Sequence, residues 1–263
     1  MTALPEIAPA PPDPLFHAQG LRKRFGGVHA VRDLSLAVPR TAIFAIIGPN
    51  GAGKSTLLNL MSGLYAPDAG RMTFDGRDLS GVPAHRRARL GLARTFQKIR
   101  LFRRLSVLAH VVAAFHIHHA IPAWQYVFHG RAFARDHARA REEAMKLLVF
   151  VGLEHRASAL AASLPYGEQR MLELARALAT APRLLLVDEP AAGLNGAEVE
   201  RLIERIRLLR ERGMTVIVVE HNMDLVMEIA DRVLVMDYGQ YLFEGTPSEV
   251  QANPAVIAAY LGA

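Results

Sequence analysis

The segment Gly48–Ser55 constrains this chain more than any other part of its sequence. It reads GPNGAGKS, which fits the pattern G-x-x-x-x-G-K-[ST], and it follows the continuous apolar run Ala42–Ile47. An apolar run of this kind is typical of a strand buried on both faces. The residues after the loop have a helical pattern, with Gly63 as the expected end. The sequence therefore predicts a buried strand, a glycine-rich loop and a helix in direct succession.

The chemistry of this loop follows from its glycines and its last two residues. Glycines let the backbone curl so that successive N–H groups point at phosphate oxygens, and the helix presents its positive end to the same anion. Lys54 is expected to reach the β- and γ-phosphates, and the Ser55 hydroxyl to contact Mg²⁺. The expected ATP-binding residues of the loop are Gly48, Pro49, Asn50, Gly51, Ala52, Gly53, Lys54, Ser55 and Thr56.

A second apolar run, Leu184–Val187, ends in two acidic residues, Asp188 and Glu189. In a parallel sheet the carboxyl ends of the strands open on the ligand crevice, so both side chains are expected there. Asp188 is then expected to hold the Mg²⁺ shell, and Glu189 to orient or deprotonate the attacking water. Phosphoryl transfer needs such positioning more than covalent help from the protein, so the pair favours phosphoryl transfer over a simple acidic turn.

The last third of the chain alternates between strands and helices, which predicts an α/β fold with a parallel sheet and helices on both sides. The expected strands are Leu184–Val187, Thr215–Val219 and Val233–Met236, and the expected helices are Glu198–Arg212 and Asn222–Ala230.

The first part of the chain has a different pattern. Residues 1–14 contain five prolines and are expected to form a flexible tail. Residues 82–179 are expected to be mostly helical. Short β-type runs are expected at Leu15–Leu21, Val28–Val31 and Leu34–Val38, with a hairpin at Arg71–Asp78.

Basic side chains gather in the middle of the chain. The sequence has 31 lysines and arginines against 25 acidic residues, a net charge of +6, yet no acidic residue lies between Asp78 and Asp136. For the stretch 86–104, which flanks Gln97, two interpretations stay open: a surface that faces a membrane partner and the anionic leaflet, or a solvated arginine-rich face. The basic residues between the two acids are Arg86, Arg87, Arg89, Arg94, Lys98, Arg100, Arg103, Arg104, Arg131 and Arg135.

The segment 105–130 contains no charged side chain and is long enough to cross a bilayer as a helix. Its histidines and Pro122 argue against a span, because each polar group costs free energy in lipid; a helix, a break and a second helix under a membrane protein are expected instead. His116, His118 and His119 are not expected to bind a metal, since no Asp, Glu or Cys is near in sequence. The absence of cysteine excludes a disulfide framework and a thiolate metal site.

Three further motifs follow one another along the chain, and their order is informative. Gln97 follows the strand-like segment LARTF, the segment Leu164–Arg170 reads LPYGEQR, and His221 follows TVIVVE. With these motifs, residues 15–262 resemble the nucleotide-binding subunit of an ABC transporter. The resemblance implies a P-loop NTPase fold of ABC type in one domain, residues 15–263. That fold has a mostly parallel sheet core, an antiparallel β subdomain and an α-helical subdomain at about 98–180.

The resemblance also assigns roles to residues. Phe25 would stack on adenine, Gln97 would touch Mg²⁺ and the water, and His221 would contact the γ-phosphate. Two ATP molecules would lie between two subunits. The residues expected to reach across the dimer are Pro165, Tyr166, Gly167, Glu168, Gln169 and Asn195; the expected catalytic residues are Glu189, His221 and Gln97; and the expected Mg²⁺ ligands are Ser55, Gln97 and Asp188.

The chain departs from the usual family pattern at Pro165, Tyr166 and Asn195, where Ser, Gly and Asp are common. Pro165 has neither a hydroxyl nor an N–H to offer a phosphate. These departures fit an asymmetric dimer of two different ATPase subunits.

Within the family, the segments RFGGVHAV, ARTFQKIRLF, AAGLN and NPAVIAAYLG look like those of ATP-binding subunits of branched-chain amino-acid importers. This implies an ATPase at the cytoplasmic face of the inner membrane that pairs with two permease subunits and a second ATPase subunit or a second copy. A substrate-binding protein would act indirectly, and no nucleic acid is expected. Related systems for urea or amide import or lipopolysaccharide export remain alternatives, as does a soluble ABC ATPase that acts on nucleic acid.

Overall fold

The computed structural model describes residues 13–97, 99–115, 117 and 131–261, and two β-sheets organise them. The larger sheet has six strands in the order β10-β9-β3-β8-β7-β6. Its first five strands in the sequence pair in parallel, as predicted, and the last, β10, is antiparallel to β9. These strands are β3 (Ile43–Ile47), β6 (Leu92–Arg94), β7 (Leu184–Asp188), β8 (Thr215–Val219), β9 (Arg232–Asp237) and β10 (Gln240–Gly245).

The smaller sheet is antiparallel, with the strand order β2-β1-β4-β5. Its strands are β1 (Phe16–Phe25), β2 (Val28–Val38), β4 (Ala69–Phe74) and β5 (Arg77–Asp78). The sequence predicted two separate runs where β2 forms one strand, and this division was wrong. Arg32 and Asp33 stay in the strand although Asp33 has a positive φ of 54°. The break in apolar periodicity marks an irregular point in the pairing with β1.

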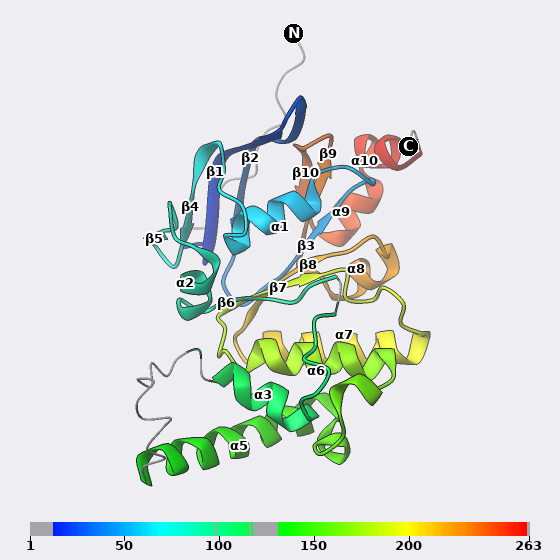
Figure 1. The fold of residues 1–263 in the computed structure, drawn as a ribbon. Coiled ribbons are helices and arrows are strands. Elements are labelled where there is room, and N and C mark those ends of the chain that lie inside the picture. The colour runs from blue at the N-terminus through cyan, green and yellow to red at the C-terminus, as the bar shows by residue number, and fades with distance from the viewer. Residues whose placement is uncertain (1–12, 98, 116, 118–130, 262–263) are drawn as a thin grey trace.

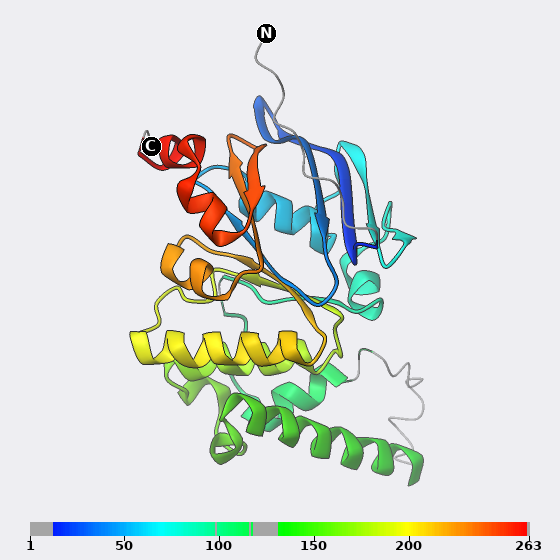
Figure 2. The ribbon, with the colours of Figure 1, turned by 180° about the vertical axis from the view of Figure 1, so that it is seen from behind.

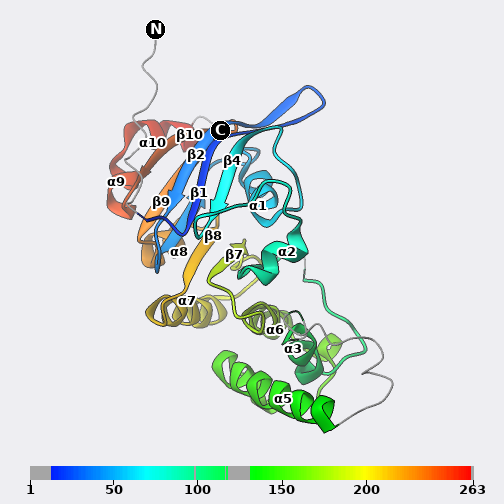
Figure 3. The same ribbon diagram turned by 90° about the vertical axis from the view of Figure 1, so that its left-hand side faces the viewer.

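Helix α1 (Lys54–Ser62) lies between the two sheets (Figures 1 and 3). It follows the glycine-rich loop, and Gly63 ends it in the left-handed conformation, as predicted. Leu57, Leu58 and Met61 of this helix are fully buried and share one core with side chains of both sheets. The loop that precedes α1 is therefore anchored on both sides by packed structure.

Helices cover the opposite face of the large sheet, and α3, α5 and α6 gather at the end of the molecule farthest from the antiparallel sheet (Figure 2). The larger ones are α3 (Val107–Phe115), α5 (Arg131–Val151), α6 (Tyr166–Leu178) and α7 (Gly196–Glu211). The shorter ones are α8 (Met223–Ile229), α9 (Pro247–Ala252) and α10 (Pro254–Leu261), with 3₁₀ turns at Glu154–Arg156 and Ala161–Ser163. Helix α2 (Ala84–Arg89) lies instead beside the end of α1 (Figure 3).

Parts of three predictions lie outside the described residues: most of the expected tail 1–14, the histidines 116, 118 and 119, and the second half of the segment 105–130. The first half of that segment contains α3, as expected. Across the described part of the chain, no helix combines the length and the apolar character needed to cross a bilayer. The tail's described end, Asp13, forms an ion pair with Arg40.

Two arginines of the basic stretch 86–104 are buried, so the expectation that this stretch lies wholly on the surface was wrong for them. The Arg87 guanidinium donates to the carbonyl oxygens of Leu60, Met61, Leu79 and Val82 at 2.8–3.0 Å. It thereby binds the end of α1 to the segment before α2. The Arg94 side chain, at the end of β6, is also largely buried, with 8% of it exposed, and forms an ion pair with Asp188.

Candidate functional site

The glycine-rich loop adopts a conformation that other residues would not fit. Gly48 and Gly53 have φ values of 148° and 93°. A Cβ atom at Gly48 would lie 2.0 Å from the Met236 carbonyl oxygen, and one at Gly53 would lie 2.2 Å from that of Ala30. Glycine is therefore required at both positions for the loop to pack against β9 and β2.

Lys54 is buried at the start of α1, where its ammonium group donates to the carbonyl oxygens of Gly48 at 2.6 Å and Pro49 at 2.9 Å. Burial lowers the pKa of Lys54, while the nearby carboxylates of Glu189 and Asp188 act to raise it. The ammonium group therefore lies within the field of both acids that end β7.

A cavity of about 330 Å³ opens over this loop. Ser55, Thr56 and Glu189 lie on its wall together with Lys54. The other lining residues are Val28, His29, Ala30, Arg32, Asn50, Gly51, Ala52, Gly53 and Tyr238. Val28, His29 and Arg32 come from β2, and Tyr238 comes from the β9–β10 turn. No local sequence signal assigns them to this site, because only the tertiary structure brings them to the loop.

Phe25, the expected adenine contact, does not line this cavity. It ends β1, and its ring packs edge-to-face against Tyr65 with 5.3 Å between centroids. The ring is 43% exposed, and the Lys23 ammonium lies 5.5 Å from its centroid. The aromatic surface is thus open to a planar ligand, at the rim and not in the cavity over the loop.

The two acids that follow Val187 occupy the carboxyl end of β7, as predicted from its apolar run. Glu189 has a positive φ of 45°, which is uncommon outside glycine, and its N–H donates to the Val219 carbonyl oxygen. Its carboxylate accepts a hydrogen bond of 2.5 Å from the Gln97 side chain. The structure therefore brings Gln97 and Glu189 together although 92 residues separate them in the sequence.

Helix α6 holds the backbone that carries Gln97. The Arg170 guanidinium donates to the carbonyl oxygens of Phe96 at 2.9 Å and Gln97 at 2.7 Å. The buried Glu173 carboxylate accepts from the Phe96 N–H at 3.1 Å, and burial raises the pKa of Glu173 against the effects of that bond and of Arg170. Arg170 also donates to the Tyr166 hydroxyl at 2.8 Å. The start of α6 and the Gln97 segment are thus one hydrogen-bonded unit.

The residues expected to reach across a dimer surround the first turn of α6. Pro165 stands at the N-cap, and a Cβ on Gly167 would lie 2.1 Å from Glu198 Oε1, so a larger residue there would displace the Glu198 side chain. Glu168 forms an ion pair with Arg156, and the Gln169 side chain donates to the Leu164 carbonyl oxygen at 2.8 Å. In this chain, then, Glu168 and Gln169 make contacts within their own subunit.

Asn195 and His221 lie on neighbouring loops. The Asn195 side chain caps α7 by accepting from the Glu198 N–H, and Glu198 returns the bond. His221 is exposed and follows the fully buried Glu220. The Glu220 carboxylate accepts from the N–H groups of Ala191, His221 and Asn222. This acid, to which no sequence motif assigned a role, joins the loop after Glu189 to the loop of His221.

The donors near Lys54 suit a magnesium ion. Mg²⁺ prefers oxygen ligands and binds through one or two protein groups together with phosphates and waters. Ser55, Gln97 and Asp188 offer a hydroxyl, an amide and a carboxylate oxygen, all hard donors. The described residues contain no group of three or more His, Cys, Asp or Glu side chains placed for a metal. This donor set fits a metal held largely by nucleotide phosphates and not by a protein cage.

A phosphate loop, an acidic strand end and a glutamine-bearing segment on these two sheets define an ATP-binding cassette. The family model described as ABC transporter matches residues 31–192, more than half of the chain, so the chain belongs to the ABC transporter family. A second model, described as a branched-chain amino acid ATP-binding cassette transporter, matches residues 242–263. The expected fold class is thereby confirmed.

Individual relatives identify the group of proteins within this family that the chain resembles. The high-affinity branched-chain amino acid transport ATP-binding protein BraF of Pseudomonas aeruginosa is 42% identical over 250 residues, which cover 95% of this chain and 98% of BraF. The corresponding protein LivG of Escherichia coli K12 is 41% identical with the same coverage. A crystal structure of a nucleotide-free ATP-binding cassette from an ABC transporter covers 95% of this chain and 99% of its own, with a TM-score of 0.82 at 28% identity.

Proposed function

We propose that this chain is the ATP-hydrolysing subunit of an importer for branched-chain amino acids, bound peripherally at the cytoplasmic face of the inner membrane. The observation that supports hydrolysis best is the convergence of Lys54, Asp188 and Glu189 with the Gln97 side chain. The cargo rests on the names of the relatives and on the match over residues 242–263. An ATPase subunit does not touch the cargo, so urea, amide or lipopolysaccharide transport would show in the identity of its partners.

The proposed reaction uses backbone and side-chain groups that lie in and around the phosphate loop. The loop N–H groups and the Lys54 ammonium bind the β- and γ-phosphates, with Lys54 exchanging the carbonyl oxygens of Gly48 and Pro49 for phosphate oxygens. Ser55, Gln97 and Asp188 would hold Mg²⁺, which, when bound, neutralises phosphate charge. Glu189 orients the attacking water and accepts its proton, and Gln97 fixes the Glu189 carboxylate through their hydrogen bond.

The proposed active unit is a dimer in which each nucleotide is completed by the other subunit. The first turn of α6 and the Asn195 loop supply the groups that reach across the dimer. Pro165 removes a hydroxyl and an N–H from that surface, while Gly167 and the positive end of α6 remain. We infer that the site completed by this chain differs from its counterpart, which suits a pair of unlike ATPase subunits.

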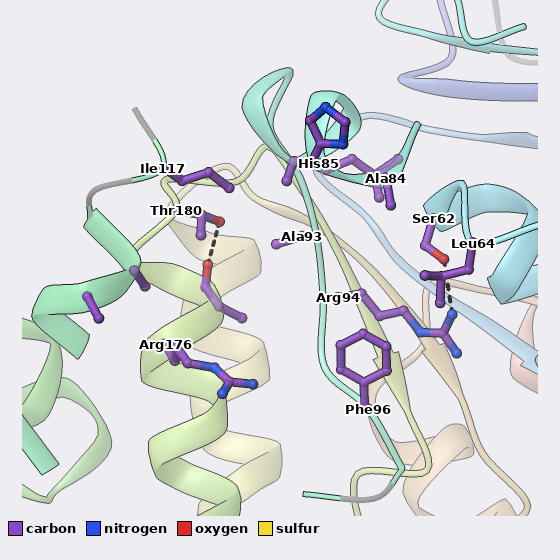
Figure 4. A pocket seen from close by; sticks show the side chains of 15 residues that line it. Ser62, Leu64, Ala84, His85, Ala93, Arg94, Phe96, Ile117, Arg176 and Thr180 are labelled. Atoms are coloured by element: carbon purple, nitrogen blue, oxygen red, sulfur yellow. Dashed lines mark hydrogen bonds between the residues drawn. The ribbon is translucent and has the colours of Figure 1, made fainter. Parts of the chain in front are cut away.

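We also propose where the permease docks. A largely apolar cavity of about 510 Å³ lies between α1, α2, α3 and α6, away from the phosphate loop (Figure 4). Phe96, next to Gln97, lies on its wall, and the Arg100 guanidinium lies over the Phe96 ring at 5.2 Å. Exposed Arg86 and Arg89 lie on α2, whose other side lines the cavity. A short cytoplasmic segment of a permease, apolar with acidic flanks, fits this chemistry and would reach Gln97.

The proposal is tested first by a mild-detergent pull-down of the tagged chain from its native membranes, with mass spectrometry of the bound proteins. Two multi-span permeases and a second ATPase are expected. One permease type with this ATPase alone would indicate a homodimeric system such as an exporter. Ribosomal proteins or RNA without any membrane protein would overturn the transport assignment.

The hydrolytic role of Glu189 is tested by Glu189→Gln in the assembled transporter. The amide keeps the size of the side chain but cannot accept a proton, so ATP binding should persist while turnover stops, and a closed dimer should accumulate with ATP. Lys54→Ala is the matched control, because it should lose binding itself. Turnover at the wild-type rate in Glu189→Gln would assign the water-positioning role to another residue.

A further inference from the structure

Arg94 is the buried arginine that touches the proposed metal carboxylate. It ends β6, and its Nη2 donates to Asp188 Oδ2 at 2.9 Å, with the two side chains only 8% and 7% exposed. Its Nη1 donates to Asn59 Oδ1 at 2.7 Å and to Ser62 Oγ at 3.0 Å. Figure 4 shows the Arg94 side chain beside the Phe96 ring, with its guanidinium directed at Ser62.

Arg94 and its partners belong to three segments, β6, α1 and β7, whose relative positions determine the geometry of the nucleotide site. Arg94 pairs with Leu186 across the parallel strands β6 and β7, so its side chain reaches forward to Asp188 at the strand end. Asn59 and Ser62 belong to α1, the helix that begins with Lys54 and carries Ser55. One guanidinium group therefore fixes the carboxylate of Asp188 relative to the helix of the other proposed metal ligand.

The geometry uses features that are particular to arginine. The guanidinium is planar and presents its donors in a rigid fork, so two neutral acceptors on Nη1 fix the direction of Nη2. Nη2 engages only one oxygen of Asp188, and among the described residues Oδ1 has no hydrogen bond to the protein. A lysine has a single point charge and would not hold all three partners in this arrangement.

The neighbouring charges show what the ion pair prevents. The Asp188 and Glu189 carboxylates both act on the Lys54 ammonium. An Asp188 side chain without Arg94 would be a buried, unpaired carboxylate, and the Lys54 ammonium, on which it already acts, could neutralise it. Such a pair would withdraw Lys54 from the phosphates and Asp188 from the metal at the same time.

We propose that Arg94 is a positioning residue for metal binding, which holds Asp188 against α1 and leaves its other oxygen, Oδ1, available to a metal ion. The inference rests on the proposed function, in which Asp188 holds the ion. Arg94 touches neither the nucleotide nor the metal; it acts through the carboxylate. Since it also lines the cavity of about 510 Å³, a segment docked there would lie against the same guanidinium.

The test separates metal-dependent from metal-independent nucleotide binding. The dissociation constant of a non-hydrolysable ATP analogue is measured with Mg²⁺ and with EDTA, and the ratio gives the contribution of the metal. In Arg94→Met this contribution should fall by about tenfold or more, the usual effect of losing a group that orients a metal ligand. The constant in EDTA should rise by a smaller factor than the constant with Mg²⁺, because it reports only the withdrawal of Lys54 from the phosphates and not the loss of the metal ligand. Arg94→Lys should restore part of the contribution.

Two controls make the outcome decisive. Arg89→Met removes an exposed arginine of α2, outside the group of residues around Asp188, and it should leave the metal contribution unchanged. Asp188→Asn removes the carboxylate itself and should abolish the contribution. If Asp188→Asn abolishes it and Arg94→Met does not reduce it, the positioning role is wrong and the proposed function stands. If neither variant changes it, the assignment of Asp188 to the metal is wrong.

Folding is checked by circular dichroism before binding is measured. If Arg94→Met does not fold, Asn59→Ala decides, since it keeps Arg94 and removes one of the two anchors on α1. Asn59→Ala should lower the metal contribution by about two- to threefold, a smaller effect than losing the orienting group altogether. A metal contribution equal to that of the unmodified chain in Asn59→Ala would then overturn the inference.

Discussion

Replacing the buried Arg87 by methionine should destabilise the protein by about 3 kcal/mol, and the structure explains this magnitude. Four carbonyl oxygens accept from the guanidinium. Those of Leu60 and Leu79 have second donors, the N–H groups of Gly63 and Val82. The carbonyls of Met61 and Val82 would lose the donor that the structure gives them, at about 1–3 kcal/mol for each buried unsatisfied group. Recovered burial of the methionine chain offsets part of this cost.

The assay is urea unfolding followed by circular dichroism, with Arg86→Met as the matched control. Arg86 precedes Arg87 on the same helix but is exposed, so its replacement should change the free energy of unfolding by less than about 0.5 kcal/mol. Equal effects of the two substitutions would refute the reasoning, because they would place Arg87 in the solvated basic face. A large decrease in the free energy of unfolding for Arg87→Met alone would show that Arg87 stabilises the end of α1.

Two further predictions concern nucleotide affinity and pH. Phe25→Ala should weaken ATP binding by about 1–2 kcal/mol, the value of a lost aromatic stack, and an unchanged dissociation constant would move the adenine contact to cavity residues such as Tyr238. Burial lowers the pKa of His110, whose Nε2 accepts from the Phe102 N–H at 2.8 Å. Below about pH 6.5 the unfolded chain therefore takes up a proton at His110 that the folded chain does not, and this favours unfolding. The free energy of unfolding is expected to decrease as the pH falls through that value. His110→Phe should reduce the loss of stability between about pH 8 and about pH 5.5 in urea unfolding; an unchanged loss would contradict the assignment.

The residues that determine the chemistry could be predicted from the sequence because each motif lies within one short stretch of the chain. Gly48–Ser55 encodes a backbone curl and its helix within one stretch of chain, and positive φ at Gly48 and Gly53 follows from that turn. The run Leu184–Val187 predicts its own burial and places Asp188 and Glu189 at a strand end. The roles taken from the family resemblance, such as those of Phe25, stay predictions until they are measured.

Only the tertiary structure decided which distant side chains meet. Arg94 and Asp188 touch because β6 and β7 are neighbours in the sheet, although 94 residues separate the two. No local pattern distinguishes Arg87 and Arg94, which are buried, from Arg86 and Arg89, which are exposed. A charge becomes internal only when packing from other segments surrounds it and supplies acceptors, and that depends on the whole fold. The sequence by itself determined the phosphate chemistry; the packing of strands and helices decided which residues hold that chemistry in place.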